Sequence, residues 1–225
     1  MPYYSLPSRA EIKQYLLKRG VKREKLKDNL DRARNHFFES QEMLSKDDEW
    51  REGAGILCLT PYNDNLLMWS HYGDQHKGVC LGFDVALPFD EIFGAGYDVE
   101  YSETYPQIPV LRMEELLVDS LNGYKNIDGY DDVVTKQFYT KAECWSYEQE
   151  IRFLRPALAH GVGSMPFPAI KLREVILGCN IEESDRIKTM NLVKKNFPHA
   201  KILQSKMEEK YYKVKYEEIA EVEKC

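Results

Sequence analysis

Two short stretches of the sequence hold most of the residues that could do chemistry, and the first is "WSHYGDQHKG". It places Trp69, His71, Tyr72, His76 and Lys77 close together. The two histidines are five residues apart, not the four that bring two zinc ligands onto one helical face, so we predict no metal site. The clustered amphipathic side chains instead predict one wall of a ligand-binding pocket. The alternative is that the aromatic residues fill a core.

The second stretch, "KAECWSYEQEIRFLRP", carries a pair of carboxylates. Glu148 and Glu150 are two residues apart on a predicted strand, so both side chains should project from the same face. Either Arg152, next along that face, pairs with them in a structural ladder, or one carboxylate faces a cleft and stabilises a developing positive charge. Trp145 and Tyr147 would then wall a pocket for a flat ligand; otherwise they are core aromatics.

The chain is predicted to begin with two amphipathic helices. In "SRAEIKQYLLKRG", Ser8 and Glu11 form a capping box, and Gly20 ends the helix. A second helix is expected over 23–46, where apolar residues recur at helical spacing opposite a strongly charged face. Both helices are expected to lie on a core and to position other elements.

From residue 53 onward the sequence predicts strands mixed with helices. Asn63 or Asp64 is expected to cap a short helix, and "YDVEYSE" alternates like a half-buried strand. Further strands are expected at 55–60, 78–85, 147–156, 200–205 and 211–219, and further helices at 112–124, 131–143 and 184–197. This order lacks a regular βαβ rhythm, so we predict an α+β fold with a mixed, mostly antiparallel sheet. We expect an N-terminal helical region at 1–52 and an α+β core at 53–225, in one domain overall.

Composition narrows the function classes. The 225 residues are 43% hydrophobic and 30% charged, as in a soluble globular protein, and the net charge of −6 gives no broad attraction to nucleic acid. No apolar run is long enough to span a membrane, and the N-terminus lacks a signal-peptide core. The five cysteines are widely spaced, which predicts reduced thiols in the cytoplasm, with Cys58 and Cys80 packed inside strands. No phosphate-binding loop, dinucleotide fingerprint or nucleophile elbow is present.

Taken together, the two stretches resemble a family. "LMWSHYGDQHKGVCLGFD", then "VEYSETYP", then "KAECWSYEQEIRFL" resemble a large bacterial family known only as a domain of unknown function. The resemblance runs from about Gly55 to Arg155. Members of that family usually carry an N-terminal block with an Asn-Asp-Pro-Phe loop, which this chain lacks; we expect either a natural short form or a truncated chain.

The late W-x-x-E-x-E strand of that family is similar to the one in ADP-ribosyltransferases, including DNA-modifying toxins. That resemblance implies an ADP-ribosyltransferase-like fold, NAD as cofactor, and a protein or nucleic-acid acceptor in phage defence or a toxin–antitoxin system. It implies that Glu150 is the catalytic carboxylate and that Glu148 meets the acceptor. It also implies that Trp145 or Tyr147 lies near the nicotinamide ring, whereas His71 and Tyr72 belong to the pocket.

Two other hypotheses compete with a transferase. In the first, the chain is a non-catalytic ligand-sensing or protein-interaction module, the partner being another protein or a second copy. Glu148 and Glu150 then pair with Arg152 and Lys141. In the second, Glu148, Glu150 and Asp84 belong to a nuclease. Geometry separates them: the transferase gains if Glu150 lines one concave pocket with His71 and Tyr72, and it loses if Glu150 is clamped by Arg152.

Overall fold

The computed structural model describes residues 3–46, 54–121, 130–156, 164 and 166–219. The chain divides into two compact units, and each is described by itself. Unit 1 comprises Met1–Gly55, Val99–Cys144 and Pro156–Val162. Unit 2 comprises Ile56–Asp98, Trp145–Arg155 and Gly163–Cys225. The helical region predicted for 1–52 contributes its helices to unit 1.

Unit 1 is mainly helical. Its helices are α1 (Arg9–Lys18), the 3-10 helix η1 (Arg23–Lys25), α2 (Leu26–Lys46), α5 (Val110–Leu121) and α6 (Tyr130–Phe138). It also holds two pairs of short parallel strands: β1 (Tyr3–Ser5) with β7 (Gln107–Pro109), and β6 (Glu100–Ser102) with β8 (Thr140–Ala142). Of the described helices in the whole chain, none has the length and apolar character needed to cross a membrane.

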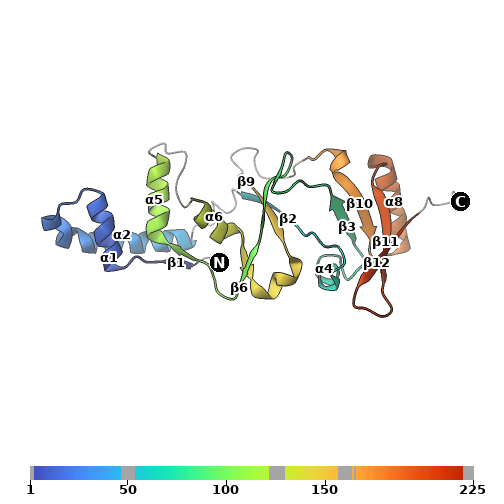
Figure 1. The fold of residues 1–225 in the computed structure, drawn as a ribbon, viewed down its shortest axis with the longest axis horizontal. Coiled ribbons are helices and arrows are strands. Elements are labelled where there is room, and N and C mark those ends of the chain that lie inside the picture. Colours follow the sequence, from blue (N-terminus) through green and yellow to red (C-terminus); the bar gives the residue numbers. More distant parts are fainter. Residues whose placement is uncertain (1–2, 47–53, 122–129, 157–163, 165, 220–225) are drawn as a thin grey trace. The chain divides into compact units, whose positions relative to one another are not determined.

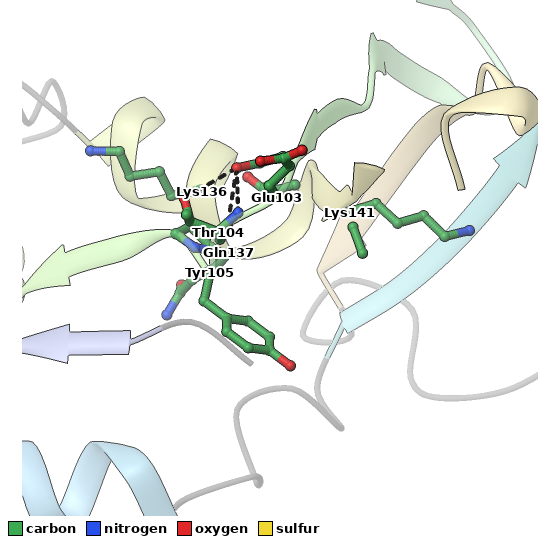
Figure 2. A pocket seen from close by; sticks show the side chains of 10 residues that line it. Glu103, Thr104, Tyr105, Lys136, Gln137 and Lys141 are labelled. Atoms are coloured by element: carbon green, nitrogen blue, oxygen red, sulfur yellow. Dashed lines mark hydrogen bonds between the residues drawn. The ribbon is translucent and has the colours of Figure 1, made fainter. Parts of the chain in front are cut away.

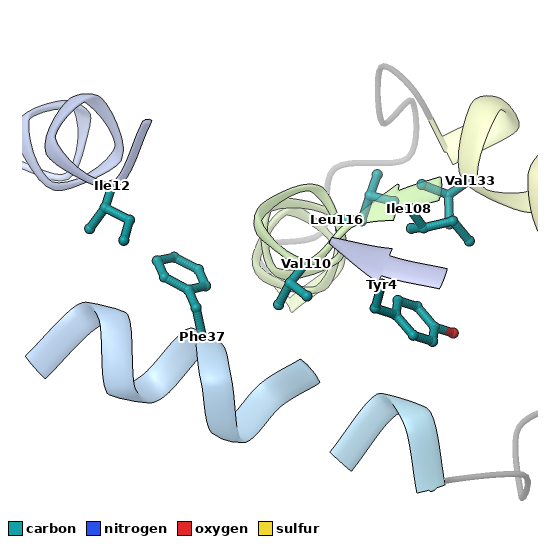
Figure 3. Packing of buried hydrophobic residues seen from close by; sticks show 7 residues of the cluster. All are labelled: Tyr4, Ile12, Phe37, Ile108, Val110, Leu116 and Val133. Atoms are coloured by element: carbon teal, nitrogen blue, oxygen red, sulfur yellow. The ribbon is translucent and has the colours of Figure 1, made fainter. Parts of the chain in front are cut away.

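The start of unit 1 follows the sequence pattern closely. The predicted capping box is present, because the Ser8 amide donates to Glu11 and the Glu11 amide donates to the Ser8 hydroxyl. Figure 3 shows Phe37 of α2 pointing towards Ile12 of α1. The buried cluster that joins these helices to the short strands consists of Tyr4, Ile12, Phe37, Ile108, Val110, Leu116 and Val133.

Unit 2 is built on two four-stranded sheets. The first has the order β12-β11-β10-β3, formed by β3 (Val79–Phe83), β10 (Leu172–Leu177), β11 (Lys201–Met207) and β12 (Val214–Glu218). The second has the order β2-β9-β5-β4, formed by β2 (Ala54–Leu59), β4 (Phe89–Asp90), β5 (Gly94–Asp98) and β9 (Ile151–Pro156). The short helices of this part are α4 (Leu66–His71), η2 (Glu143–Glu148) and η3 (Ala169–Lys171).

The central strand β10 is covered on both faces. On one face Val175 and Leu177 pack against Met190 and Val193 of α8 (Glu183–Asn196), the helix that links the parallel strands β10 and β11 (Figure 1). On the other face Ile176 packs in a cluster with Trp69 of α4 and Val214 of β12. Burial on both faces explains the apolar run of Val175, Ile176 and Leu177 in β10.

The predicted α+β class with a mixed sheet is confirmed. Some element predictions were wrong in detail. The single strand expected at "YDVEYSE" is two strands, because β5 ends at Asp98, Val99 is buried, and the Glu100 amide of β6 bonds the Tyr139 carbonyl of unit 1. The cap of α4 is Asn65 rather than its neighbours, because its side chain accepts from the backbone amides of the first turn. The helix expected to reach residue 143 ends at Phe138, where the chain extends into β8.

Candidate functional site

The two stretches singled out by the sequence meet within unit 2. The Tyr72 hydroxyl donates to Oε1 of Glu148 at 2.8 Å. Nδ1 of His71 and the Tyr147 hydroxyl share a hydrogen bond of 2.9 Å. The Asn65 side-chain amide, at the start of α4, donates to the Tyr147 carbonyl at 2.8 Å. Two of these contacts join side chains 76 residues apart, and the third joins a side chain to the backbone 82 residues away.

A tight left-handed turn follows α4 and sets the position of the first stretch. Asp74, Gln75 and His76 have backbone φ angles of 46°, 54° and 66°. Residues other than glycine rarely adopt this left-handed conformation. The His76 carbonyl accepts from the Asn180 amide at 2.9 Å. A Cβ on Gly178 would lie only 2.0 Å from that carbonyl oxygen, so only glycine fits there. The strained turn is held by this close contact.

The second stretch does not run as one strand through both glutamates. Glu148 ends η2, Gln149 has a φ of 46°, and Glu150 comes immediately before β9. The prediction that both side chains project from one face of a strand was therefore wrong. A single left-handed residue changes the chain direction between them, so Glu148 meets Tyr72 whereas Glu150 meets Arg152.

Three rings gather around the junction of the two stretches. His71 lies 6.0 Å from Trp145 and 6.1 Å from Tyr147, and Trp145 and Tyr147 are 5.9 Å apart, all between ring centroids. Glu148 is only 3% exposed, whereas the ring of Tyr72 is 63% exposed. We call His71, Tyr72, Trp145, Tyr147 and Glu148 the aromatic–carboxylate cluster. It combines accessible ring surface with a buried acceptor.

Glu150 is clamped by Arg152. Nε donates to Oε1 at 2.9 Å and Nη2 donates to Oε2 at 3.1 Å, and both side chains are mostly buried. Burial alone would lower the pKa of Arg152, but the hydrogen bond and charge of Glu150 outweigh burial and raise that pKa. The Cys58 thiol lies beside the same guanidinium. Arg152 therefore keeps its positive charge, and both oxygens of Glu150 accept hydrogen bonds from its guanidinium.

The other predicted residues of the first stretch have different places. Trp69 is 4% exposed and its indole N–H donates to the Asn63 carbonyl at 2.6 Å, so it belongs to the core. Its ring stacks on His76 at 6.2 Å. Nε2 of His76 lies 3.3 Å from the Ser70 hydroxyl, and its buried Nδ1 has no partner among the described residues. Lys77 is exposed on the turn.

Unit 2 also holds a cleft that sequence reasoning missed. Its volume is about 480 Å³, and it lies between β3 and β10 of one sheet and β2 and β9 of the other. The lining residues are Cys58, Leu59, Thr60, Pro61, Tyr62, Asn63, Cys80, Leu81, Gly82, Phe83, Val85, Leu87, Ile151, Phe153, Glu174 and Ile176. Cys58 is exposed, so the prediction that it is packed inside a strand was wrong, and Leu81 is 47% exposed. Among the described strands, β2 and β3 each lie at the edge of a sheet. Gly82 inside an apolar strand was a sequence signal for the cleft.

A separate pocket of about 310 Å³ lies in unit 1, and no residue predicted for the site lines it (Figure 2). Its walls carry hydroxyl groups, the amide of Gln137 and the exposed ring of Tyr105. Figure 2 shows the side chains of Lys136 and Lys141 extending in opposite directions. The two cations therefore do not converge on one ligand group.

The nuclease hypothesis finds little geometric support. Asp84 is about half exposed and is paired with Arg173 at 2.7 Å, rather than with either glutamate. Within the residues that the structure describes, no group of three or more His, Cys, Asp or Glu side chains could hold a metal ion. The three carboxylates of that hypothesis each have a different partner.

Comparison with known proteins gives one match. Residues 68–153 match the model of a family described as "Protein of unknown function (DUF2971)". The matched segment runs from α4 into β9 and contains the whole aromatic–carboxylate cluster and the Glu150–Arg152 pair. The predicted resemblance to a domain of unknown function is confirmed at this level. No curated protein and no solved structure matches the chain.

Proposed function

We propose that unit 2 is a ligand-binding module that takes NAD, or another small ligand with a flat ring, at the aromatic–carboxylate cluster without turning it over. One observation carries the proposal. The two stretches of the matched segment meet through Tyr72–Glu148 and His71–Tyr147, which sets three rings around a buried carboxylate. Ring faces beside a few fixed polar groups are typical of small-molecule sites.

The cluster suits the two parts of a nicotinamide nucleoside. His71 is exposed and Trp145 and Tyr147 are half-buried, so they offer ring surface on which a flat heterocycle can stack. The carboxylate of Glu148, held by the Tyr72 hydroxyl, can accept hydrogen bonds from ribose hydroxyls. Charged acceptors make the stronger hydrogen bonds, so this group would contribute most to orientation.

The state of Glu150 is the reason for proposing binding without turnover. A carboxylate stabilises a developing positive charge because its own charge is directed at the reacting centre. In Glu150 both oxygens are bound by the guanidinium of Arg152, which neutralises that charge. The Glu150–Arg152 pair is therefore the observation that argues against transferase activity at Glu150.

The test is a calorimetric titration of the purified chain with NAD, together with chromatography for released nicotinamide. We expect saturable binding and no release above the buffer blank. Tyr72→Phe should weaken binding about fivefold, because it removes the hydroxyl that holds Glu148. Tyr211→Phe, at a 70% exposed tyrosine elsewhere in unit 2, should bind as the wild type does. No saturable binding at millimolar NAD, or equal affinity of both variants, would contradict the proposal.

A second candidate is an ADP-ribosyltransferase that modifies a protein or nucleic acid, in phage defence or as a toxin. The observation that favours it is Glu148, a buried carboxylate held at 2.8 Å by Tyr72 beside the rings. It predicts transfer of label from NAD to a lysate component, and its loss in Glu148→Gln. Glu143→Gln, at an exposed glutamate of the same 3-10 helix, should keep the activity. Absence of transfer by the wild type argues against this candidate.

We further propose that the protein acts in the cytoplasm. Within the described residues, Cys58, Cys80, Cys144 and Cys179 form no disulfide bond. Free, widely spaced thiols are typical of proteins kept in a reducing compartment.

A further inference from the structure

The cleft between β2 and β3 contains a carboxylate of an unusual kind. Glu174 of β10 is half-buried, and within the described residues no hydrogen bond or ion pair is recorded for it. Its register neighbours are Gly82 of β3 on one side and the exposed Lys201 of β11 on the other. Carboxylates in a partly desolvated place usually have a hydrogen-bonded or charged partner.

The sequence makes room for this carboxylate. A Cβ on Gly82 would lie 3.1 Å from Cβ of Glu174 and 3.5 Å from its Oε2. The Glu174 side chain therefore packs over Gly82, in the space beside the Cβ that any residue other than glycine would have at position 82. The charge of Glu174 also reaches Cys80. Burial raises the pKa of the Cys80 thiol, and the charge of Glu174 raises that pKa further. Glu174 thus lies on the face of β3 that lines the cleft.

The rest of the cleft lining is mostly apolar, with Thr60 and Asn63 as its uncharged polar side chains. Tyr62, Leu81, Phe83, Phe153 and Ile176 supply ring and aliphatic surface. Of the described residues that line the cleft, Glu174 is the one with a formally charged side chain. The volume of about 480 Å³ is in the range of sites for small organic ligands. An apolar cleft with a single carboxylate is complementary to an apolar body with a single cation.

We propose that the β2–β3 cleft binds a small amphiphilic cation, an aromatic or aliphatic body with one primary amine, and that Glu174 receives the ammonium group. The apolar walls hold the body of the ligand. The ammonium donates to the Glu174 carboxylate, and such charge-assisted hydrogen bonds are among the stronger polar contacts. This site uses none of the residues of the aromatic–carboxylate cluster, so it stands independently of the proposed function.

The test is a matched series of three probes of similar size: phenethylamine, 2-phenylethanol and 3-phenylpropionate. Each is titrated into the full chain and followed by protein NMR or calorimetry. We expect phenethylamine to bind about tenfold more tightly than the alcohol, because only the amine makes a charged contact, and the carboxylate to bind most weakly. Shifted signals should belong to cleft residues such as Leu81 and Phe153.

Two variants assign the preference to one carboxylate. Glu174→Gln should remove the advantage of the amine over the alcohol and leave binding of the alcohol unchanged. Glu209→Gln, at an exposed glutamate of unit 2, should keep that advantage. Equal binding of the three probes by the wild type, no saturable binding, or an amine preference that survives Glu174→Gln would overturn the proposal. The wild-type series decides without any variant, so poor folding of Glu174→Gln would not protect the proposal.

Discussion

The aromatic–carboxylate cluster and the β2–β3 cleft lie in the same unit, but their carboxylates differ in whether they have hydrogen-bond partners within the protein. At the cluster, Glu148 is bound by Tyr72, and the adjacent Glu150 is bound on both oxygens by Arg152. In the cleft, Glu174 has no hydrogen-bond or ion-pair partner within the described residues and lies among mostly apolar side chains. A carboxylate such as Glu150, with both oxygens bound by one cation of the protein, contributes to the fold, whereas one without such a partner in a cavity is available to a ligand.

Asp90 of unit 2 marks the fully satisfied extreme of this comparison. Its side chain is completely buried. It accepts from the backbone amides of Ala86, Ile92 and Phe93 and from Nζ of Lys171 at 2.7 Å. Four donors on one carboxylate tie the segment around β4 to η3. Nothing is left for a ligand, so Asp90 serves stability.

The largest expected effect is therefore at Asp90. Asp90→Ala should lower the free energy of unfolding by about 3–5 kcal/mol, because it removes the buried acceptor of three backbone amides and of the partly buried Lys171 ammonium. Urea unfolding followed by circular dichroism measures this. Asp84→Ala, which breaks the exposed pair with Arg173, should cost no more than about 1 kcal/mol. Similar losses in both variants would contradict the comparison.

The stability of the fold should also depend on pH through Asp90. Burial would raise the pKa of Asp90, but hydrogen bonds from the Ala86 amide and from Lys171 outweigh burial and hold the pKa well below its usual range. A lowered pKa in the folded state stabilises the fold above the unfolded value of about 4, and this stabilisation is lost as the pH falls further. The urea midpoint should drop below about pH 4, and the drop should be smaller in Asp90→Asn.

The next largest effect is expected at the Glu150–Arg152 pair. Glu150→Gln should lower the free energy of unfolding by about 3 kcal/mol, because the guanidinium keeps its charge and loses its counterion in a place that is mostly buried. The double variant Glu150→Gln/Arg152→Met should lose less than the sum of the single losses, as a thermodynamic cycle of unfolding would measure. A stable, inactive Glu150→Gln would instead return Glu150 to a catalytic role.

The smallest effect is expected in the cleft. Glu174→Gln should change the free energy of unfolding by no more than about 0.5 kcal/mol in either direction, because no recorded partner is lost and the shape is kept. Thermal and urea unfolding of this variant beside Glu150→Gln give the contrast directly. A loss of about 2 kcal/mol or more would show that Glu174 belongs to the fold and would remove the difference between the two regions.

Features that depend on residues close together along the chain could be predicted from the sequence alone. The capping box of Ser8 and Glu11, the α+β class and the run of apolar residues in β10 all follow from spacing over a few residues. The sequence also identified the two stretches that meet, because unusual residue types are visible without any fold. Arg152 as a partner of Glu150 was one of the two interpretations, since the residues are two apart.

The tertiary structure was needed to show which distant side chains contact each other and which carboxylate faces the cleft. Tyr72 and Glu148 are joined across 76 residues, a contact that no local pattern encodes. The left-handed Gln149 separates two glutamates that simple strand alternation would place together. The place of β3 at the edge of its described sheet cannot be read from the sequence either, because an apolar run looks the same in a central strand and in an edge strand. Long-range pairing is set by the packing of whole elements, so the carboxylate in the cleft emerged only from the fold.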